Sequence, residues 1–135
     1  MRLTALLLLT LLCASCTGPV NGSTSNPRLL ALPAANPAIY KKVDLKAWKN
    51  PYVIVRTDGV GLLDVTNNEE HLMKSDELTD ALAQLPPSAW PYGRVVALAD
   101  DRGPSADKAR ISDNKAKIAS MLHSSQVEIQ WVPSS

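Results

Sequence analysis

The sequence YVIVRTDGVGLLDV, residues 52–65, carries the clearest structural signal in the chain. Residues 52–56 are β-branched or aromatic up to the final arginine, which is typical of a strand. Asp58-Gly59 follows, and an Asp-Gly pair between two apolar runs is a strong hairpin signal. Residues 60–65 are then expected to form the returning strand.

Two helices and two further strands are predicted downstream of this hairpin. Residues 75–85 carry leucines at i, i+4 and i+7, which form one apolar face of a helix. Residues 94–99 are almost continuously apolar, as in a strand covered on both faces. Residues 66–74 read as a polar turn, with residues 71–73 as a possible short extra strand.

The C-terminal part repeats the same succession of a helix and a strand. Residues 106–123 place Ile111, Ile118 and Leu122 on one helix face. Residues 126–132 alternate with a period of two, which predicts a half-buried strand. Its apolar side chains are expected to face the same core as the helices: Val127, Ile129 and Trp131. The order β-β-α-β-α-β indicates a small two-layer α+β domain with helices on one face of the sheet.

The domain is expected to span residues 46–135, preceded by a linker over residues 16–45. The linker is rich in Pro, Ser and Asn, and recurrent proline opposes a sustained helix. It also lacks the large apolar side chains that a core requires. As a flexible coil it would have a root-mean-square reach on the order of 30 Å.

Residues 1–15 are predicted to be a signal peptide. Arg2 precedes an apolar run over residues 3–12, and small residues lead to Cys16. The run is shorter than the roughly 20 residues of a spanning helix. Two alternatives stay open: an uncleaved membrane anchor, and a secreted protein that is cut before Cys16.

The sequence Cys13-Ala14-Ser15-Cys16 resembles the lipobox of bacterial lipoproteins. The resemblance implies thioether lipidation of Cys16 and cleavage between Ser15 and Cys16, so that lipid tethers the protein to a membrane of the cell envelope. Thr17 follows the cysteine rather than aspartate, which implies the periplasmic face of the outer membrane if the host is Gram-negative. Cys13 would leave with the signal, so no disulfide is expected within a monomer.

The charge distribution argues against nucleic acid as a partner. Without Arg2 the chain has 13 basic and 13 acidic residues. Residues 17–50 have a net charge of +4 and residues 51–135 a net charge of −4. An acidic domain on a basic tether is a poor candidate for binding nucleic acid.

Trp90 and Tyr92 are the candidate partner-binding residues. They flank a proline just before the apolar run at residues 94–99. If exposed, they would offer rigid contact area to a peptide or glycan. If buried, they would close the end of the sheet.

No motif predicts catalysis, a cofactor or a metal site. Asp100-Asp101 follows a strand, where a carboxylate pair can share a proton, but a turn also needs Asp for backbone hydrogen bonds. Glu69-Glu70-His71 reads as a solvated loop, and His123 as the end of a helix. The sequence therefore favours a non-enzymatic binding protein; the alternative is a cell-envelope hydrolase that uses carboxylates such as Asp100 and Asp101. An open cleft lined by these two residues and His123 would favour the hydrolase.

The run PYGRVV at residues 91–96 resembles the periplasmic domains of biopolymer-transport proteins of the ExbD/TolR type. The resemblance implies the fold of residues 52–132 and a protein or peptidoglycan partner in the envelope. That family also has an N-terminal membrane helix with a proton-linked aspartate, and residues 3–15 contain no acidic residue. The resemblance therefore implies envelope binding without proton-driven force. An exposed edge strand would suit an extended peptide.

Overall fold

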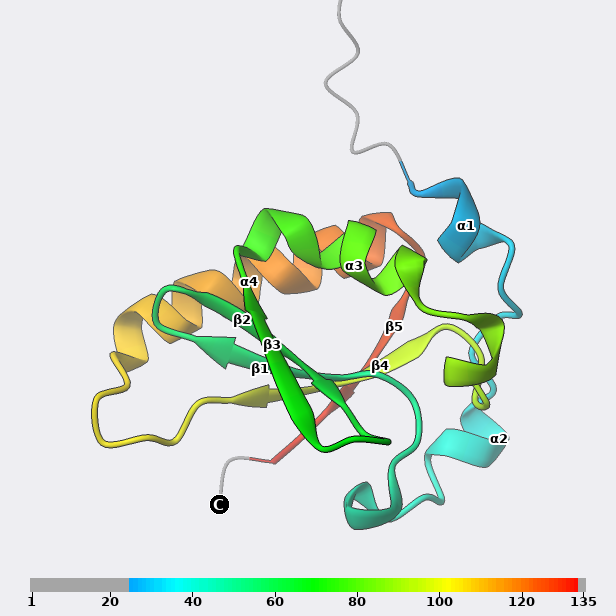
Figure 1. Cartoon of the computed structure of the whole chain (residues 1–135), viewed down its shortest axis with the longest axis horizontal. Coiled ribbons are helices and arrows are strands. Elements are labelled where there is room, and N and C mark those ends of the chain that lie inside the picture. The colour runs from blue at the N-terminus through cyan, green and yellow to red at the C-terminus, as the bar shows by residue number, and fades with distance from the viewer. Residues whose placement is uncertain (1–24, 134–135) are drawn as a thin grey trace, which may run out of the picture.

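The computed structural model of the chain describes residues 25–133, which form one mixed five-stranded sheet with helices on one face (Figure 1). The strands are β1 (Tyr52–Arg56), β2 (Gly59–Asp64), β3 (Glu69–Met73), β4 (Val95–Asp100) and β5 (Glu128–Trp131). Their order in the sheet is β3-β2-β1-β4-β5. The pairs β1–β2 and β2–β3 are antiparallel, and β1–β4 and β4–β5 are parallel. The predicted two-layer α+β class is confirmed, with β3 as an additional strand.

The helices cover one face of this sheet. They are α3 (Leu78–Gln84), preceded by the 3-10 turn η2 (Ser75–Glu77), and the long α4 (Lys108–Ser124). Asp107 caps α4, because its carboxylate accepts hydrogen bonds from the first free backbone N–H groups of the helix. The main core lies between the two layers, and its wholly buried side chains include Val53, Val55, Val96, Leu78, Leu82, Ile118 and Leu122.

The final strand departs from the sequence prediction at one residue. Val127 is buried and Ile129 packs against the main core, as expected. Trp131 is instead 46% exposed, because β5 is an edge strand and α4 does not cover its end. The indole lies under the ammonium group of Lys115, 5.2 Å from the ring centroid. Trp131 therefore lies at the edge of the sheet beneath Lys115 of α4 rather than in the core.

Residues 26–45 pack against the domain, so the predicted flexible linker does not extend to residue 45. They contain two single-turn helices, α1 (Pro27–Leu30) and α2 (Pro37–Tyr40), followed by the 3-10 turn η1 (Leu45–Ala47). Leu29 is wholly buried in the main core. Backbone hydrogen bonds hold the segment to the turn before β4, from Asn36 N–H to the Tyr92 carbonyl and from Arg94 N–H to the Pro33 carbonyl.

Local chemistry explains why the linker composition was misleading. Pro27 and Pro37 each occupy the first turn of a helix, where a missing N–H leaves no hydrogen bond unmade. Asn26 and Asn36 precede them, and each side chain caps the helix that follows. The same prolines that suggested an unstructured chain therefore begin two short helices.

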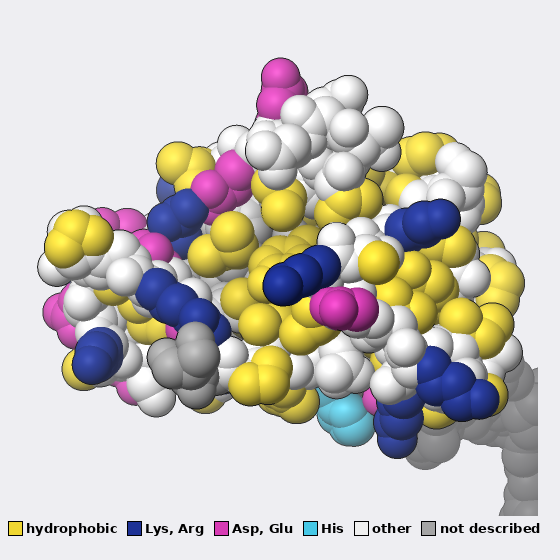
Figure 2. Space-filling view, turned by 90° about the horizontal axis from the view of Figure 1, so that it is seen from below, with side chains coloured by type: hydrophobic (Ala, Val, Ile, Leu, Met, Phe, Trp, Pro, Cys, Tyr) yellow, Lys and Arg dark blue, Asp and Glu magenta, His cyan; other side chains and the backbone are white. Residues whose placement is uncertain are grey.

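The segment before β1 gives the sheet a partial cover on its second face. Tyr40, Trp48 and Tyr92 form an aromatic cluster there, with ring centroids 6.5 Å apart for Tyr40–Trp48 and 5.0 Å apart for Trp48–Tyr92. Val95 and Ala97 of β4 are buried beneath them. Figure 2 looks onto this side and shows apolar side chains across its middle with basic side chains among them. β4 is thus buried on both faces, as its sequence predicts.

One buried polar side chain, Asn50, joins the start of β1 to the start of β4. It is fully buried, and its amide donates to the carbonyls of Gly93 and Val95, both at 2.8 Å. Its own carbonyl accepts from Tyr92 N–H at 2.9 Å. Gly93 has a φ of 79°, and a Cβ there would lie 2.2 Å from the Ala34 carbonyl oxygen. Only glycine can adopt the backbone conformation of this turn. The side chain of Asn50 supplies the hydrogen-bond partners of the backbone groups around it.

Replacing Asn50 with alanine should destabilise the protein strongly. Asn50→Ala leaves the Val95 carbonyl and the Tyr92 N–H group without partners, while the Gly93 carbonyl keeps its bond from Val95 N–H. We therefore expect a loss of about 3 kcal/mol in the free energy of unfolding. Urea denaturation followed by circular dichroism measures this. Lys49→Ala, at the exposed neighbouring position, is the control and should change stability by no more than about 0.5 kcal/mol. Equal urea midpoints for Asn50→Ala and wild type would contradict this role.

Candidate functional site

The structure changes the interpretation of the residues that sequence analysis selected for binding. Cys16 lies outside the described residues. Trp90 and Tyr92 are only 4% and 7% exposed. Trp90 belongs to the main core, and Tyr92 belongs to the aromatic cluster on the second face. Of the two alternatives for these residues, the structure therefore shows the buried one, in which they close the end of the sheet and offer no exposed surface to a partner.

The two carboxylates after β4 are both held in ion pairs. Lys115 of α4 lies 3.0 Å from Asp100, and Arg56 of β1 lies 3.0 Å from Asp101. Asp101 also accepts a hydrogen bond from Gly103 N–H at 2.9 Å. That bond, together with the charge of Arg56, lowers the pKa of Asp101. Both carboxylates therefore hold the end of β4 in place.

The predicted hydrolase set does not assemble. His123 is exposed at the end of α4 and lines a hollow that contains neither Asp100 nor Asp101. Glu70 of the Glu69-Glu70-His71 run is bound by the guanidinium of Arg56, with Nε 2.8 Å from Oε1. Within residues 25–133, no three His, Cys, Asp or Glu side chains are grouped so that they could hold a metal ion.

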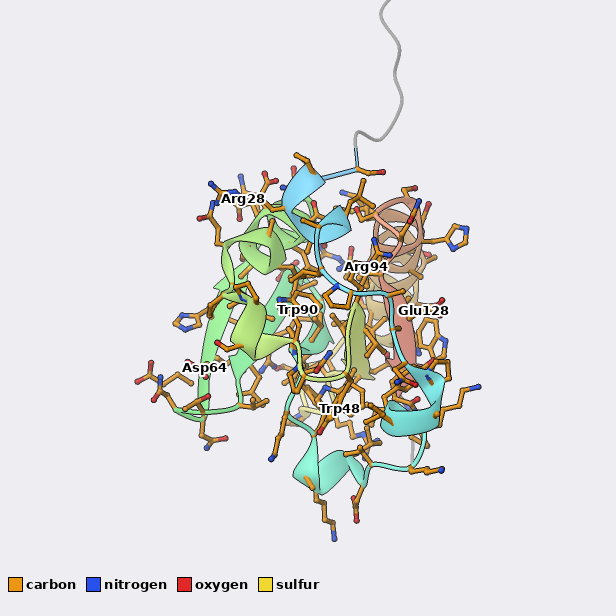
Figure 3. All side chains as sticks on the ribbon, turned by 90° about the vertical axis from the view of Figure 1, so that its right-hand side faces the viewer. Arg28, Trp48, Asp64, Trp90, Arg94 and Glu128 are labelled. Carbon is orange, nitrogen blue, oxygen red and sulfur yellow. The ribbon has the colours of Figure 1, made fainter. Side chains whose placement is uncertain are left out.

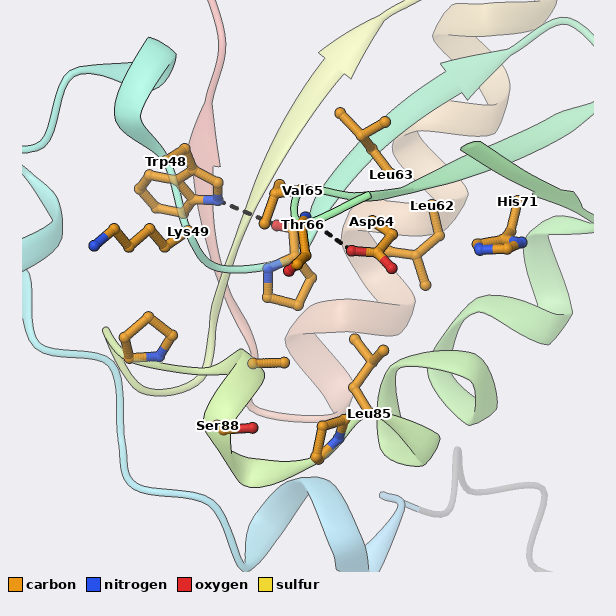
Figure 4. Close-up of a pocket in the computed structure, with 14 residues that line it drawn as sticks. Trp48, Lys49, Leu62, Leu63, Asp64, Val65, Thr66, His71, Leu85 and Ser88 are labelled. Carbon is orange, nitrogen blue, oxygen red and sulfur yellow. Dashed lines mark hydrogen bonds between the residues drawn. The ribbon is translucent and has the colours of Figure 1, made fainter. Parts of the chain in front are cut away.

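The candidate binding site is an apolar groove at the end of the sheet, which we call the Trp48 groove (Figure 4). Its volume is about 640 Å³, within the usual range for ligand pockets. Three segments line it: the loop before β1, the end of β2 and its turn, and the stretch around the 3-10 turn η3 (Pro87–Ala89). The apolar lining residues are Trp48, Pro51, Leu62, Leu63, Val65, Leu85, Pro86, Ala89 and Pro91.

The polar side chains of the Trp48 groove do not form a catalytic relay. Asp64 holds the turn after β2, accepting from Thr66 N–H at 2.8 Å, and this bond is the main cause of its lowered pKa. Ser88 and His71 also line the groove, but they lie well apart in Figure 4. Neither side chain makes a hydrogen bond with any residue that the structure describes. This arrangement can bind an apolar group, but it has no base positioned to activate a nucleophile.

A second hollow lies along β5, at the opposite edge of the sheet, and we call it the β5-edge hollow. It has a volume of about 760 Å³, and Arg94, His123, Ser124, Gln126 and Glu128 supply its polar lining. Figure 3 places Arg94 and Glu128 at this edge and Asp64 at the far side of the sheet. The two hollows are therefore separate sites.

Sequence analysis did not find either hollow. The Trp48 groove combines residues far apart in the chain, such as Lys49, Thr66 and Ser88, and no local motif connects them. Pro91 was the nearest signal, because it lies between the two predicted aromatics and does line the groove. In the sequence, Arg94 appears only as part of the PYGRVV run. The one sequence feature that could have indicated the β5-edge hollow is this charged residue next to an apolar strand.

Comparison of the chain with protein-family models, with curated proteins and with solved structures found no match. Among the helices of residues 25–133, none has the length and apolar character needed to span a membrane.

Replacing Asp101 with asparagine should make the free energy of unfolding less dependent on pH under acidic conditions. The pKa of Asp101 is lower in the folded chain than the value of about 3.9 in the unfolded chain. The ionised carboxylate therefore contributes fully to the free energy of unfolding above about pH 4, and this contribution is lost as the pH falls through the folded pKa. Unfolding free energies between pH 6 and pH 2 should therefore fall less steeply in Asp101→Asn. Asp113→Asn, at an exposed position of α4, corrects for the change in net charge. Parallel profiles for Asp101→Asn and wild type would contradict the assignment.

Proposed function

We propose that this protein is a lipid-anchored, non-enzymatic protein of the cell envelope whose domain binds a protein partner in the Trp48 groove. The supporting observation is the groove itself, which is apolar and open and lacks a base–nucleophile pair. The resemblance of residues 91–96 to ExbD/TolR-type domains is consistent with a partner in the envelope. The hydrolase alternative needs free carboxylates, and those of Asp100 and Asp101 are held by Lys115 and Arg56.

The lining of the groove favours a protein segment over a peptidoglycan partner. Glycans are usually held by exposed aromatic faces and by polar side chains, whereas apolar grooves take apolar side chains of a partner. Trp48 is only 5% exposed, and its indole N–H donates to the Pro51 carbonyl. Val65 and Leu85 instead offer aliphatic surface beside the prolines.

The packed N-terminal segment changes what the lipid anchor would do. Ser25 is held at the domain, since its hydroxyl donates to the Ser124 carbonyl at 2.8 Å. Ser25 lies nine residue steps after Cys16, and a chain of that length spans at most about 32 Å. In this proposal the lipid keeps the domain close to the membrane surface, at the periplasmic face of the outer membrane if the host is Gram-negative.

Removing the lipidated cysteine should release the protein from the membrane. Several acyl chains, at about 0.8 kcal/mol per buried methylene, make an anchor effectively permanent. Cys16→Ser should therefore move the protein to the soluble fraction of lysed cells, as measured by fractionation and immunoblotting. Cys13→Ser is the matched control and should leave the mature protein in the membrane fraction. Membrane retention of Cys16→Ser would contradict the lipoprotein assignment.

A photo-crosslinking experiment tests the partner and the groove together. A benzophenone amino acid at Ser88, on the rim of the groove, should give an adduct of discrete mass in living cells. The same amino acid at Lys117, on the exposed side of α4, is the control and should not give that adduct. Val65→Glu should abolish the adduct, because it places a charge in the apolar lining.

The fate of the adduct decides between the two partner classes. Digestion by protease but not by a muramidase is expected. A muramidase-sensitive adduct would replace the protein partner by peptidoglycan. Equal adducts from the two positions would show that the Trp48 groove is not the binding site.

A further inference from the structure

Among residues 25–133, no side chain or backbone group pairs with the guanidinium of Arg94. Arg94 is partly buried, its Nε is fully buried, and its side chain makes no hydrogen bond or ion pair with the residues that the structure describes. An arginine is always charged, and burying its Nε without a hydrogen-bond partner costs free energy. The other arginines beside carboxylates in this chain, such as Arg56 and Arg110, are paired with them.

Glu128, the acidic residue that lines the same hollow, does not pair with Arg94. Glu128 lines the same hollow, but no oxygen of its carboxylate lies within 4.0 Å of the guanidinium. On the other face of the sheet, burial raises the pKa of Tyr40, and the negative charge of Glu128 raises it further. His123, Ser124 and Gln126 surround the rest of the hollow, and none of them is an acid.

The floor of the β5-edge hollow offers unpaired backbone groups. Glu128 N–H donates to the Arg94 carbonyl, and Val132 N–H donates to the Leu98 carbonyl, so these residues turn their backbone toward β4. In a strand the alternate residues turn the other way. Ile129 and Trp131 therefore direct their N–H and carbonyl groups to the open edge of the sheet. Such an edge can pair with one more extended chain.

We infer that the β5-edge hollow is a second binding site, which takes an extended peptide with a free C-terminal carboxylate through Arg94. A carboxylate matches the planar fork of a guanidinium in a bidentate, charge-assisted pair. The backbone of the peptide pairs with the open edge at Ile129 and Trp131. This site is separate from the Trp48 groove and does not depend on the proposed function.

The position of Arg94 sets the direction of the bound peptide. Arg94 lies next to the first residue of β5, as its backbone bond to Glu128 shows. A peptide whose carboxylate reaches Arg94 therefore ends where β5 begins and runs antiparallel to it. Its side chains on the helix side enter the hollow between β5 and the end of α4, beside His123 and Ser124.

Two forms of one peptide test the carboxylate directly. The probe is a fluorescein-labelled hexapeptide of alternating threonine and valine, made with a free C-terminal carboxylate and with a C-terminal amide. Fluorescence anisotropy with the full-length protein, purified in detergent, measures both affinities. The carboxylate form should bind about tenfold tighter or more, because a charge-assisted pair is lost in the amide.

Variants assign that preference to Arg94. Arg94→Gln should bind both forms equally, at the level of the amide in wild type, and Arg94→Lys should keep part of the preference. Arg28→Gln, the same change at an exposed arginine of α1, should keep it whole. Circular dichroism melting confirms that each variant is folded.

Three results would overturn the inference: no measurable binding of either peptide, equal binding of the two forms by wild type, or an unchanged preference in Arg94→Gln. The comparison of the two peptides on wild type stands even if Arg94→Gln fails to fold. Since neither the anchor nor Ser88 takes part, failure here leaves the proposed function standing. A failed crosslink at Ser88 likewise leaves this site standing.

Discussion

The three hydrogen bonds of Asn50 hold together the parts of the protein that the groove requires. They connect the start of β1 to the turn before β4, two segments more than 40 positions apart in the chain. The turn needs this support because Gly93 has a left-handed backbone and lies against the Ala34 carbonyl, so its own polar groups cannot join the sheet. With the turn fixed, Tyr92 packs against Trp48 on one face and Trp90 enters the core on the other. The loop at Trp48 and the stretch at Pro91 then become two walls of the groove.

The N-terminal segment shows how the same residue type can give opposite structural results. Proline inside a helix or a sheet disrupts it, whereas proline in the first helical turn fixes φ at a suitable value without losing a bond. Pro27 and Pro37 follow asparagines that cap the helices they begin. Leu29 then enters the core and Tyr40 covers the second face of the sheet. The predicted linker over residues 16–45 has 30 residues, but only nine of them, residues 16–24, precede the packed segment. A chain of nine residues would hold a lipid-anchored domain near its membrane.

Features that depend on residues close together in the sequence were predictable, whereas features that depend on residues far apart in the sequence were not. The β1–β2 hairpin, α3, α4 and the doubly buried β4 were predictable, because their signals are periodic and lie within a few residues of each other. The exposure of Trp131 was not predictable, because the period of a strand gives its face but not its place at the edge of a sheet. The burial of Trp90 and Tyr92 depended on Asn50 and Tyr40, which lie far away in the sequence. The Trp48 groove depended on three distant segments and had no local signal at all.

The distribution of satisfied and unsatisfied charges separates structural from recognition roles in this protein. The carboxylates of Asp100 and Asp101, which the sequence offered as a catalytic pair, are both held by neighbouring side chains. The carboxylate of Asp64 in the Trp48 groove is likewise held, by Thr66 N–H. A carboxylate held by an arginine and a backbone N–H stays ionised and fixes a loop, so it is poorly suited to exchange protons during a reaction. Arg94 is the reverse case, since it carries a charge beside an open sheet edge and no side chain of the described residues forms an ion pair or hydrogen bond with it. Within residues 25–133, these three aspartates therefore hold loops and strand ends in place, whereas Arg94 is left for the anionic group that we infer it binds.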